Sequence, residues 1–159
     1  MSDDPEARLA YGITLYSGEA ARVAEVGKWG EITVGWYDSD AGGLSEQLFS
    51  RLYDLIPDAP ALEYAWQKED PARDHWGVDL VRSGTWDYSG WILVATRGPG
   101  ETYPYASVEW SDVMELDLDA LAHEDRLPDW DARITAAITA LEITPTQTTP
   151  KWLVFPFYG

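Results

Sequence analysis

The chain contains no cysteine and no asparagine, and its 159 residues include only two histidines, His75 and His123. The absence of cysteine excludes disulfides and thiolate metal sites. The sequence also lacks a Gly-x-Ser-x-Gly nucleophile elbow, a Gly-x-Gly-x-x-Gly motif and a phosphate-binding loop with its lysine. We therefore assign no catalytic residue and expect no bound cofactor.

Long apolar runs are absent as well. The longest, Trp91 to Ala95, is far too short to cross a bilayer, and the acidic start of the chain, Met1 to Glu6, is unlike a signal or transit peptide. We therefore expect a cytoplasmic protein that does not enter a membrane. With 45% hydrophobic residues, the chain is long enough for one domain with its own core, and we expect residues 1–7 to be flexible.

Positive charge is scarce. Eleven lysine and arginine residues stand against 28 acidic ones, which gives a net charge of −17. Such a charge repels nucleic acid and anionic membranes and attracts basic partners, so we expect no direct nucleic-acid binding. The same acidity also serves solubility, and the lack of asparagine beside abundant alanine and glycine fits a GC-rich genome. Both interpretations of the charge stay open at this point.

Alternation of apolar and polar residues predicts strands, and apolar residues three and four apart predict helices. Leucines at four- and three-residue steps give a helix over residues 44–56, which Pro57 ends. Asp129 begins a second helix, residues 129–143, as its N-cap. The expected strands are residues 9–16, 31–37, 76–80, 91–96, 105–110, 114–119 and 152–155.

The order of these elements argues against a parallel doubly wound sheet, because strands and helices do not alternate. We predict a single α+β domain with a mostly antiparallel sheet and two helices packed on one face. The last strand, residues 152–155, carries an apolar run that must be covered. The helical side chains expected against the sheet are Leu48, Leu52, Leu55, Ile134, Ile138 and Leu141.

The most unusual stretch is acidic. From Glu109 to Asp131 there are nine acidic residues and one arginine, a net charge of −8. If residues 114–119 are extended, three of the carboxylates project from one strand face at intervals of about 6.6 Å. This regular row without counterions suggests an electrostatic docking surface for a basic partner. The residues assigned to that surface are Glu109, Asp112, Glu115, Asp117, Asp119, Glu124 and Asp125.

Two other kinds of site use the same stretch or its neighbours. A metal site would draw on Asp117, Asp119, His123 and Glu124, but an extended backbone at Asp119 spoils their geometry, so we expect no metal. A sugar-binding groove would combine tryptophan rings with two acids. Its candidates are Asp74, Asp87 and Glu109 beside Trp76, Trp86 and Trp110, although aromatic residues in strands more often pack a core.

The C-terminal stretch Leu141-Glu142-Ile143-Thr144-Pro145-Thr146-Gln147-Thr148-Thr149-Pro150-Lys151-Trp152-Leu153, with the final Tyr158-Gly159, resembles the tails of small acidic proteins encoded by actinobacteria and their phages and plasmids. Residues 87–93 and the pair Tyr11-Gly12 are also similar to that group. The resemblance implies a GC-rich host and a mobile-element setting. It brings no activity and no catalytic residue with it.

Three functions follow from these observations. The first is a non-enzymatic protein that docks on a basic surface of a host protein, in its sharpest form as a mimic of nucleic acid. The second is an enzyme or ligand-binding module built on the tryptophan–acid cluster. The third is a domain whose charge serves only solubility. A deep pocket lined by exposed tryptophan and paired carboxylates favours the second function, and an acidic face without such a pocket favours the first.

Overall fold

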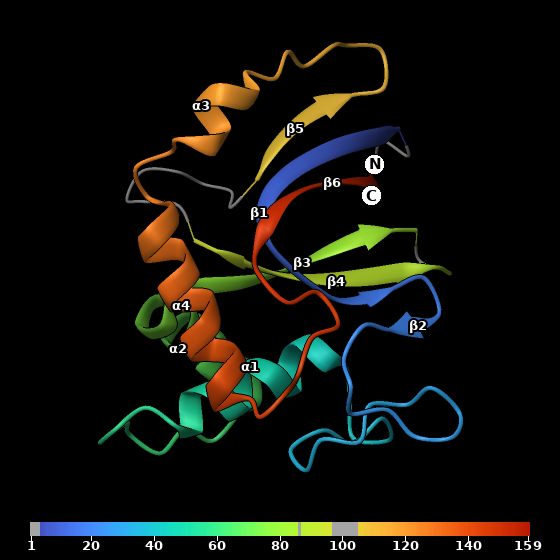
Figure 1. Ribbon diagram of the computed structural model, residues 1–159. Coiled ribbons are helices and arrows are strands. Elements are labelled where there is room, and N and C mark those ends of the chain that lie inside the picture. The colour runs from blue at the N-terminus through green and yellow to red at the C-terminus, as the bar shows by residue number, and fades with distance from the viewer. Residues whose placement is uncertain (1–3, 86, 97–104) are drawn as a thin grey trace.

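The computed structural model describes residues 4–85, 87–96 and 105–159, and in them a sheet of six strands with four α-helices (Figure 1). The strands are β1 (Pro5–Ser17), β2 (Ala20–Ala21), β3 (Val78–Gly84), β4 (Ser89–Ala95), β5 (Ala106–Glu109) and β6 (Lys151–Tyr158). The helices are α1 (Leu44–Asp54), α2 (Glu69–Trp76), α3 (Leu118–Ala122) and α4 (Leu127–Ala140), with the 3-10 helix η1 (Ala65–Lys68) before α2. The predicted α+β class is confirmed.

Strand β1 holds the sheet together because it pairs with four other strands, all antiparallel. Its first half, residues 5–12, lies against β6, and residues 6–9 also pair with β5. Its second half pairs with β4 and then with β2. β3 pairs with β4 and meets β6 in parallel at Gly84 and Phe157, so the curved sheet closes on itself.

Gly12 is the residue where β1 passes from one set of partners to the other. It is aligned with Lys151 of β6 and with Val94 of β4. A Cβ atom at this position would lie 2.2 Å from the carbonyl oxygen of Leu93. Only glycine allows the two strands to come this close.

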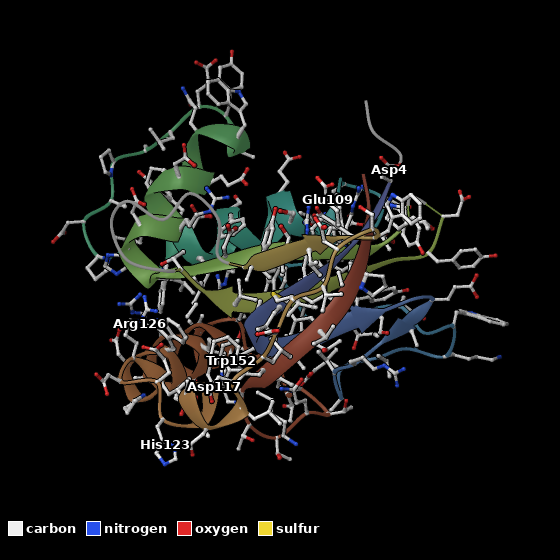
Figure 2. All side chains as sticks on the ribbon, turned by 90° about the horizontal axis from the view of Figure 1, so that it is seen from above. Asp4, Glu109, Asp117, His123, Arg126 and Trp152 are labelled. Carbon is white, nitrogen blue, oxygen red and sulfur yellow. The ribbon has the colours of Figure 1, made fainter. Side chains whose placement is uncertain are left out.

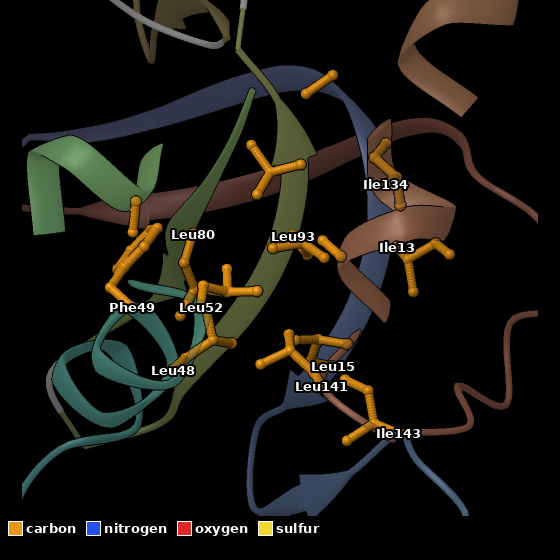
Figure 3. Close-up of a cluster of buried hydrophobic side chains, with 14 of the residues drawn as sticks. Ile13, Leu15, Leu48, Phe49, Leu52, Leu80, Leu93, Ile134, Leu141 and Ile143 are labelled. Carbon is orange, nitrogen blue, oxygen red and sulfur yellow. The ribbon is translucent and has the colours of Figure 1, made fainter. Parts of the chain in front are cut away.

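Helices α1, α2 and α4 cover the face of the sheet formed by β3, β4 and the second half of β1 (Figure 1). The predicted packing of two helices on one face is therefore confirmed, with α2 as an unexpected third. Each buried leucine contributes about 1.5–3 kcal/mol through removal of its side chain from water. The buried side chains on this face include Ile13, Leu15, Leu48, Leu52, Leu80, Leu93, Ile134 and Leu141 (Figure 3).

A second, smaller cluster packs on the opposite face of the sheet. Its members alternate with the first cluster along β3 and β4, as successive strand residues point to opposite faces. Strand β4 is therefore buried on both faces. The buried residues of this cluster are Ala10, Val81, Ile92, Val94 and Phe155.

Several predicted boundaries and two predicted strands were wrong. Residues 31–37 contain only an isolated bridge from Ile32 to Val26, and residues 114–119 are a loop that runs into α3. The strand expected at residue 76 begins at Val78, because α2 extends to Trp76 and is followed by Gly77, whose positive φ of 64° fits a helix C-terminus. Residues 5–7, which we expected to be flexible, belong to β1 and pair with β5 and β6.

None of the helices among the described residues is long and apolar enough to cross a membrane.

Truncation of Leu52 tests the helix-covered core. Leu52→Ala should lower the free energy of unfolding by roughly 2–5 kcal/mol, because it loses transfer energy and leaves a cavity in a fully buried site. The same change at Leu118, which is 72% exposed, is the matched control and should cost no more than about 0.5 kcal/mol. Urea titrations of both variants measure this, and equal costs would contradict the assignment of Leu52 to the core.

Candidate functional site

The acidic segment, residues 109–126, crosses from the end of β5 to the start of α4 and is exposed over most of its length. It contains one short helix, α3, which precedes α4 and lies away from α1 and α2 (Figure 1). The carboxylate of Asp117 accepts a hydrogen bond from the backbone N–H of Ala120 at 3.0 Å and so caps α3. The extended strand expected at residues 114–119 therefore gives way to a capped helix.

The regular row of carboxylates does not exist, since Glu115 precedes α3, Asp117 caps it and Asp119 lies in its first turn. None of the strands that the structure describes pairs with residues 114–117 and accepts their backbone hydrogen bonds. The Asp117 side chain satisfies one backbone donor locally instead, which favours a turn of helix over an unpaired strand.

Helix α3 is attached to the sheet through Trp152. The indole N–H of this β6 residue donates to the carbonyl oxygen of Leu121 at 3.0 Å, and Figure 2 shows Asp117 next to Trp152, with His123 at the outer margin. The Trp152 ring also contacts Tyr11 of β1 and Trp130 of α4, with centroids 5.4 and 6.0 Å away. These rings place the acidic segment at the edge of the helix-covered face.

The hydroxyl of Tyr11 donates to Asp131 Oδ1 at 2.6 Å and joins β1 to α4. Burial, followed by this hydrogen bond and the nearby negative charge, raises the pKa of Tyr11 well above its usual range. Asp131, the last acid of the tract, therefore serves the fold.

The remaining acids divide into two groups. Glu124 accepts from Arg126, whose Nε lies 2.9 Å from Oε1, and Asp119 lies 3.4 Å from His123. Within the part of the chain that the structure describes, four other carboxylates of the segment have no hydrogen bond or ion pair. These four are Glu109, Asp112, Glu115 and Asp125.

An apolar surface borders this segment on the outer side of β5, β1 and β6. Residues directly opposite one another in paired strands point to the same face, and Ala7 is opposite both Val108 and Pro156. Pro5 is opposite Tyr158, and its carbonyl oxygen accepts the N–H of Trp110 at 3.1 Å. We call this surface the open face; its residues are Pro5, Ala7, Val108, Trp110, Val154, Pro156 and Tyr158.

The residues of the open face line a hollow of about 360 Å³, and the acids Glu109 and Asp112 also lie at the border of this hollow. Trp110 is 69% exposed, Val154 64% and Tyr158 40%. The expectation that the last strand is covered is therefore correct for Phe155 and wrong for Val154. Apolar side chains also point outward from the acidic segment, at Val113, Leu116 and Leu118.

The backbone at Asp119 is helical and not extended as we expected, and neither the metal site nor the sugar-binding groove gains support from the positions of its candidate residues. Asp119 and His123 share a face of α3, but no group of three or more metal-ligating side chains occurs in residues 4–85, 87–96 and 105–159. Trp76 donates its indole N–H to Leu52 in the core, whereas Trp110 lies at the hollow. Trp86 lies outside the described residues.

Sequence reasoning found the carboxylates but missed the apolar half of the site. The signal was present in Val154 to Tyr158, which is apolar at every position and so supplies both faces of β6. Which face remains open depends on the register with β1 and on where the helices end. Neither can be read from local periodicity.

No family model, no curated protein and no solved structure matches the chain.

The bond between Tyr11 and Asp131 gives a prediction for alkaline pH. Because folding raises the pKa of Tyr11, the unfolded state releases this proton first, so its stabilising contribution is complete below about pH 10 and is lost as the pH rises further. Tyr11→Phe should remove that part of the pH dependence and cost about 1 kcal/mol at neutral pH. Denaturant titrations between neutral pH and pH 11, with exposed Tyr88→Phe as control, measure both effects. Parallel stability curves for wild type and Tyr11→Phe would show that the bond does not form.

Proposed function

We propose that the chain is a non-enzymatic interaction domain that docks through its open face and the adjoining carboxylates on a basic, partly apolar surface of another protein. The observation that carries this proposal is the position of Trp110, mostly exposed at the same hollow as Val154 and Tyr158, with Glu109 and Asp112 also among the residues around that hollow. Tryptophan and tyrosine are enriched at the centre of protein interfaces. A contiguous apolar surface edged by charge is typical of an interaction site.

The charge pattern indicates the nature of the partner. A second copy of this chain would bring the same carboxylates to the contact, which disfavours self-association. A partner with lysine or arginine around an apolar patch would fit both parts of the surface. In the setting that the resemblance implies, this partner is a basic host protein.

Mimicry of nucleic acid receives less support than simple docking. A mimic needs carboxylates at regular intervals that match phosphates, and the carboxylates here lie on a loop and on one turn of helix. The apolar residues at the hollow have no counterpart in a phosphate backbone. A docking surface describes these residues better: tryptophan and tyrosine would supply the affinity, and the acids would orient the partner and raise the association rate.

Two sets of substitutions separate these contributions. Neutralising Glu109→Gln, Asp112→Asn and Glu115→Gln together should slow association at low salt, because it removes the steering field, and the difference should shrink at high salt. Trp110→Ala should mainly accelerate dissociation, since most interface truncations act on that rate. Asp117 is left intact because its loss would uncap α3.

The wild type and each variant are first used to capture proteins from an actinobacterial lysate. A protein that the wild type captures and the variants capture less well is then purified, and its association and dissociation rates are measured with each of them. Trp66→Ala is the matched control, since Trp66 is 71% exposed but belongs to η1 and not to the hollow. All variants should keep the wild-type stability within about 0.5 kcal/mol. If the same proteins bind the wild type, Trp110→Ala and the triple variant with unchanged rates, the open face is not a docking surface.

A further inference from the structure

A second hollow lies far from the acidic segment in the sequence and has a different composition. It encloses about 380 Å³ between the ends of β1 and β4, the start of α1 and the turn at residues 27–31. Four of the ten residues around it are aromatic, and none of the ten is lysine, arginine or histidine. The four rings belong to Tyr16, Trp29, Tyr37 and Trp91.

The rings surround the hollow and do not fill it. Ring contacts occur elsewhere in the described chain, for example between Trp36 and Tyr37, but none joins two of these four rings. Trp29 is 83% exposed, whereas the other three are half-buried. Aromatic faces that line a space without stacking on one another leave their π-surfaces available to a ligand.

The turn that carries Trp29 is held in a defined shape by Glu31. One carboxylate oxygen of Glu31 accepts the backbone N–H of Trp29 at 2.8 Å, and the N–H of Gly27 donates to the Glu31 carbonyl at 2.8 Å. A Cβ atom on Gly27 would lie 1.9 Å from the other carboxylate oxygen, so a side chain at this position would displace the Glu31 carboxylate. Gly30 has a positive φ of 82°, which also favours glycine.

The residues that line the hollow carry one negative charge and no positive one. Glu31 is the single charged residue among those that line it. Burial, the neighbouring Tyr16 and the charge of Asp38 raise the pKa of Tyr37, so the surroundings disfavour a further negative charge. An anionic ligand is therefore disfavoured. The ammonium of Lys28 lies 4.9 Å from the centroid of the Trp29 ring, within the range of a cation–π contact.

We propose that this hollow, which we call the aromatic cage, binds the alkylated ammonium group of an organic cation. The aromatic rings that line the hollow can supply cation–π attraction, and the negative charge of Glu31 adds a favourable electrostatic contribution. The hydroxyls of Ser39 and Ser89 at its margin can orient polar groups attached to that cation. This site is independent of the open face and of any protein partner.

Choline is a suitable probe, and its uncharged isostere, in which carbon replaces the ammonium nitrogen, is the control ligand. Titrations of the full chain labelled with nitrogen-15 would follow the indole N–H signals of Trp29 and Trp91 by NMR. Choline should shift both signals, and the isostere should bind about two- to thirty-fold more weakly, as expected from loss of the cation–π attraction. Equal binding of the two ligands, or no shift with choline, would overturn the proposal.

Two variants locate the site. Trp29→Ala should weaken choline binding by about two- to thirty-fold, while Trp66→Ala should leave it unchanged. Glu31→Gln keeps an acceptor for the N–H of Trp29 and removes only the charge, so it should weaken choline by about two- to five-fold and leave the isostere unaffected. Unaltered choline binding in Trp29→Ala would place the cation elsewhere. Shifts of the same signals by glucose but not by choline would show a neutral sugar site instead.

Discussion

The dual pairing of β1 is the constraint on which the rest of the structure depends. One strand of thirteen residues joins β5 and β6 at its start to β4 and β2 at its end, and the change of partners occurs at Gly12, where a side chain would strike Leu93. Because successive residues of β1 alternate between faces, Leu9, Ile13 and Leu15 lie on the outer side throughout. The same outer side is packed against helices at one end of β1 and open at the other.

The open face arises because the helices do not reach it. Helix α4, with fourteen residues, extends about 21 Å, and its contacts with the sheet end near Trp130, where the ring meets Tyr11 and Trp152. Helix α3 lies beyond this point but has only five residues, and its described attachment to β6 runs through the indole of Trp152. The chain between β5 and α3 has no regular structure, so its carboxylates and the apolar strand residues come to share one border.

The long, strongly periodic elements could be predicted from the sequence. The leucine spacing that predicts α1, the β3–β4 pair and the apolar run of β6 all reflect burial of one or both faces, which local periodicity records. The segments at residues 31–37 and 114–119 show the limit of that reasoning. Both alternate like strands, but a strand needs a neighbour for its backbone hydrogen bonds, and in these segments a turn around Glu31 and a cap by Asp117 satisfy the backbone locally.

For a related reason, the sequence predicted the acidic residues of the candidate site but not its apolar residues. A row of acids is visible in any sequence, but the exposure of Trp110, Val154 and Tyr158 results from the register of three strands that are distant in the chain. The aromatic cage similarly combines Tyr16, Trp29, Tyr37 and Trp91. No periodic pattern links these four positions, since only the approach of the turn at residues 27–31 to the ends of β1 and β4 brings them together.

Solubility and docking are not competing explanations of the acidity. At physiological salt the field of an exposed charge is screened within about 8 Å, so most of the net charge of −17 cannot act on a molecule at the open face. The carboxylates at its border, Glu109 and Asp112, can do so. When two copies meet by this face, these acids oppose one another and discourage association through the apolar residues. When a basic surface approaches, the same acids are attracted to it, and the distant carboxylates serve solubility alone. Under the proposed docking function, the acids at the border would thus disfavour contact between two copies through the open face and favour basic partners at the same time.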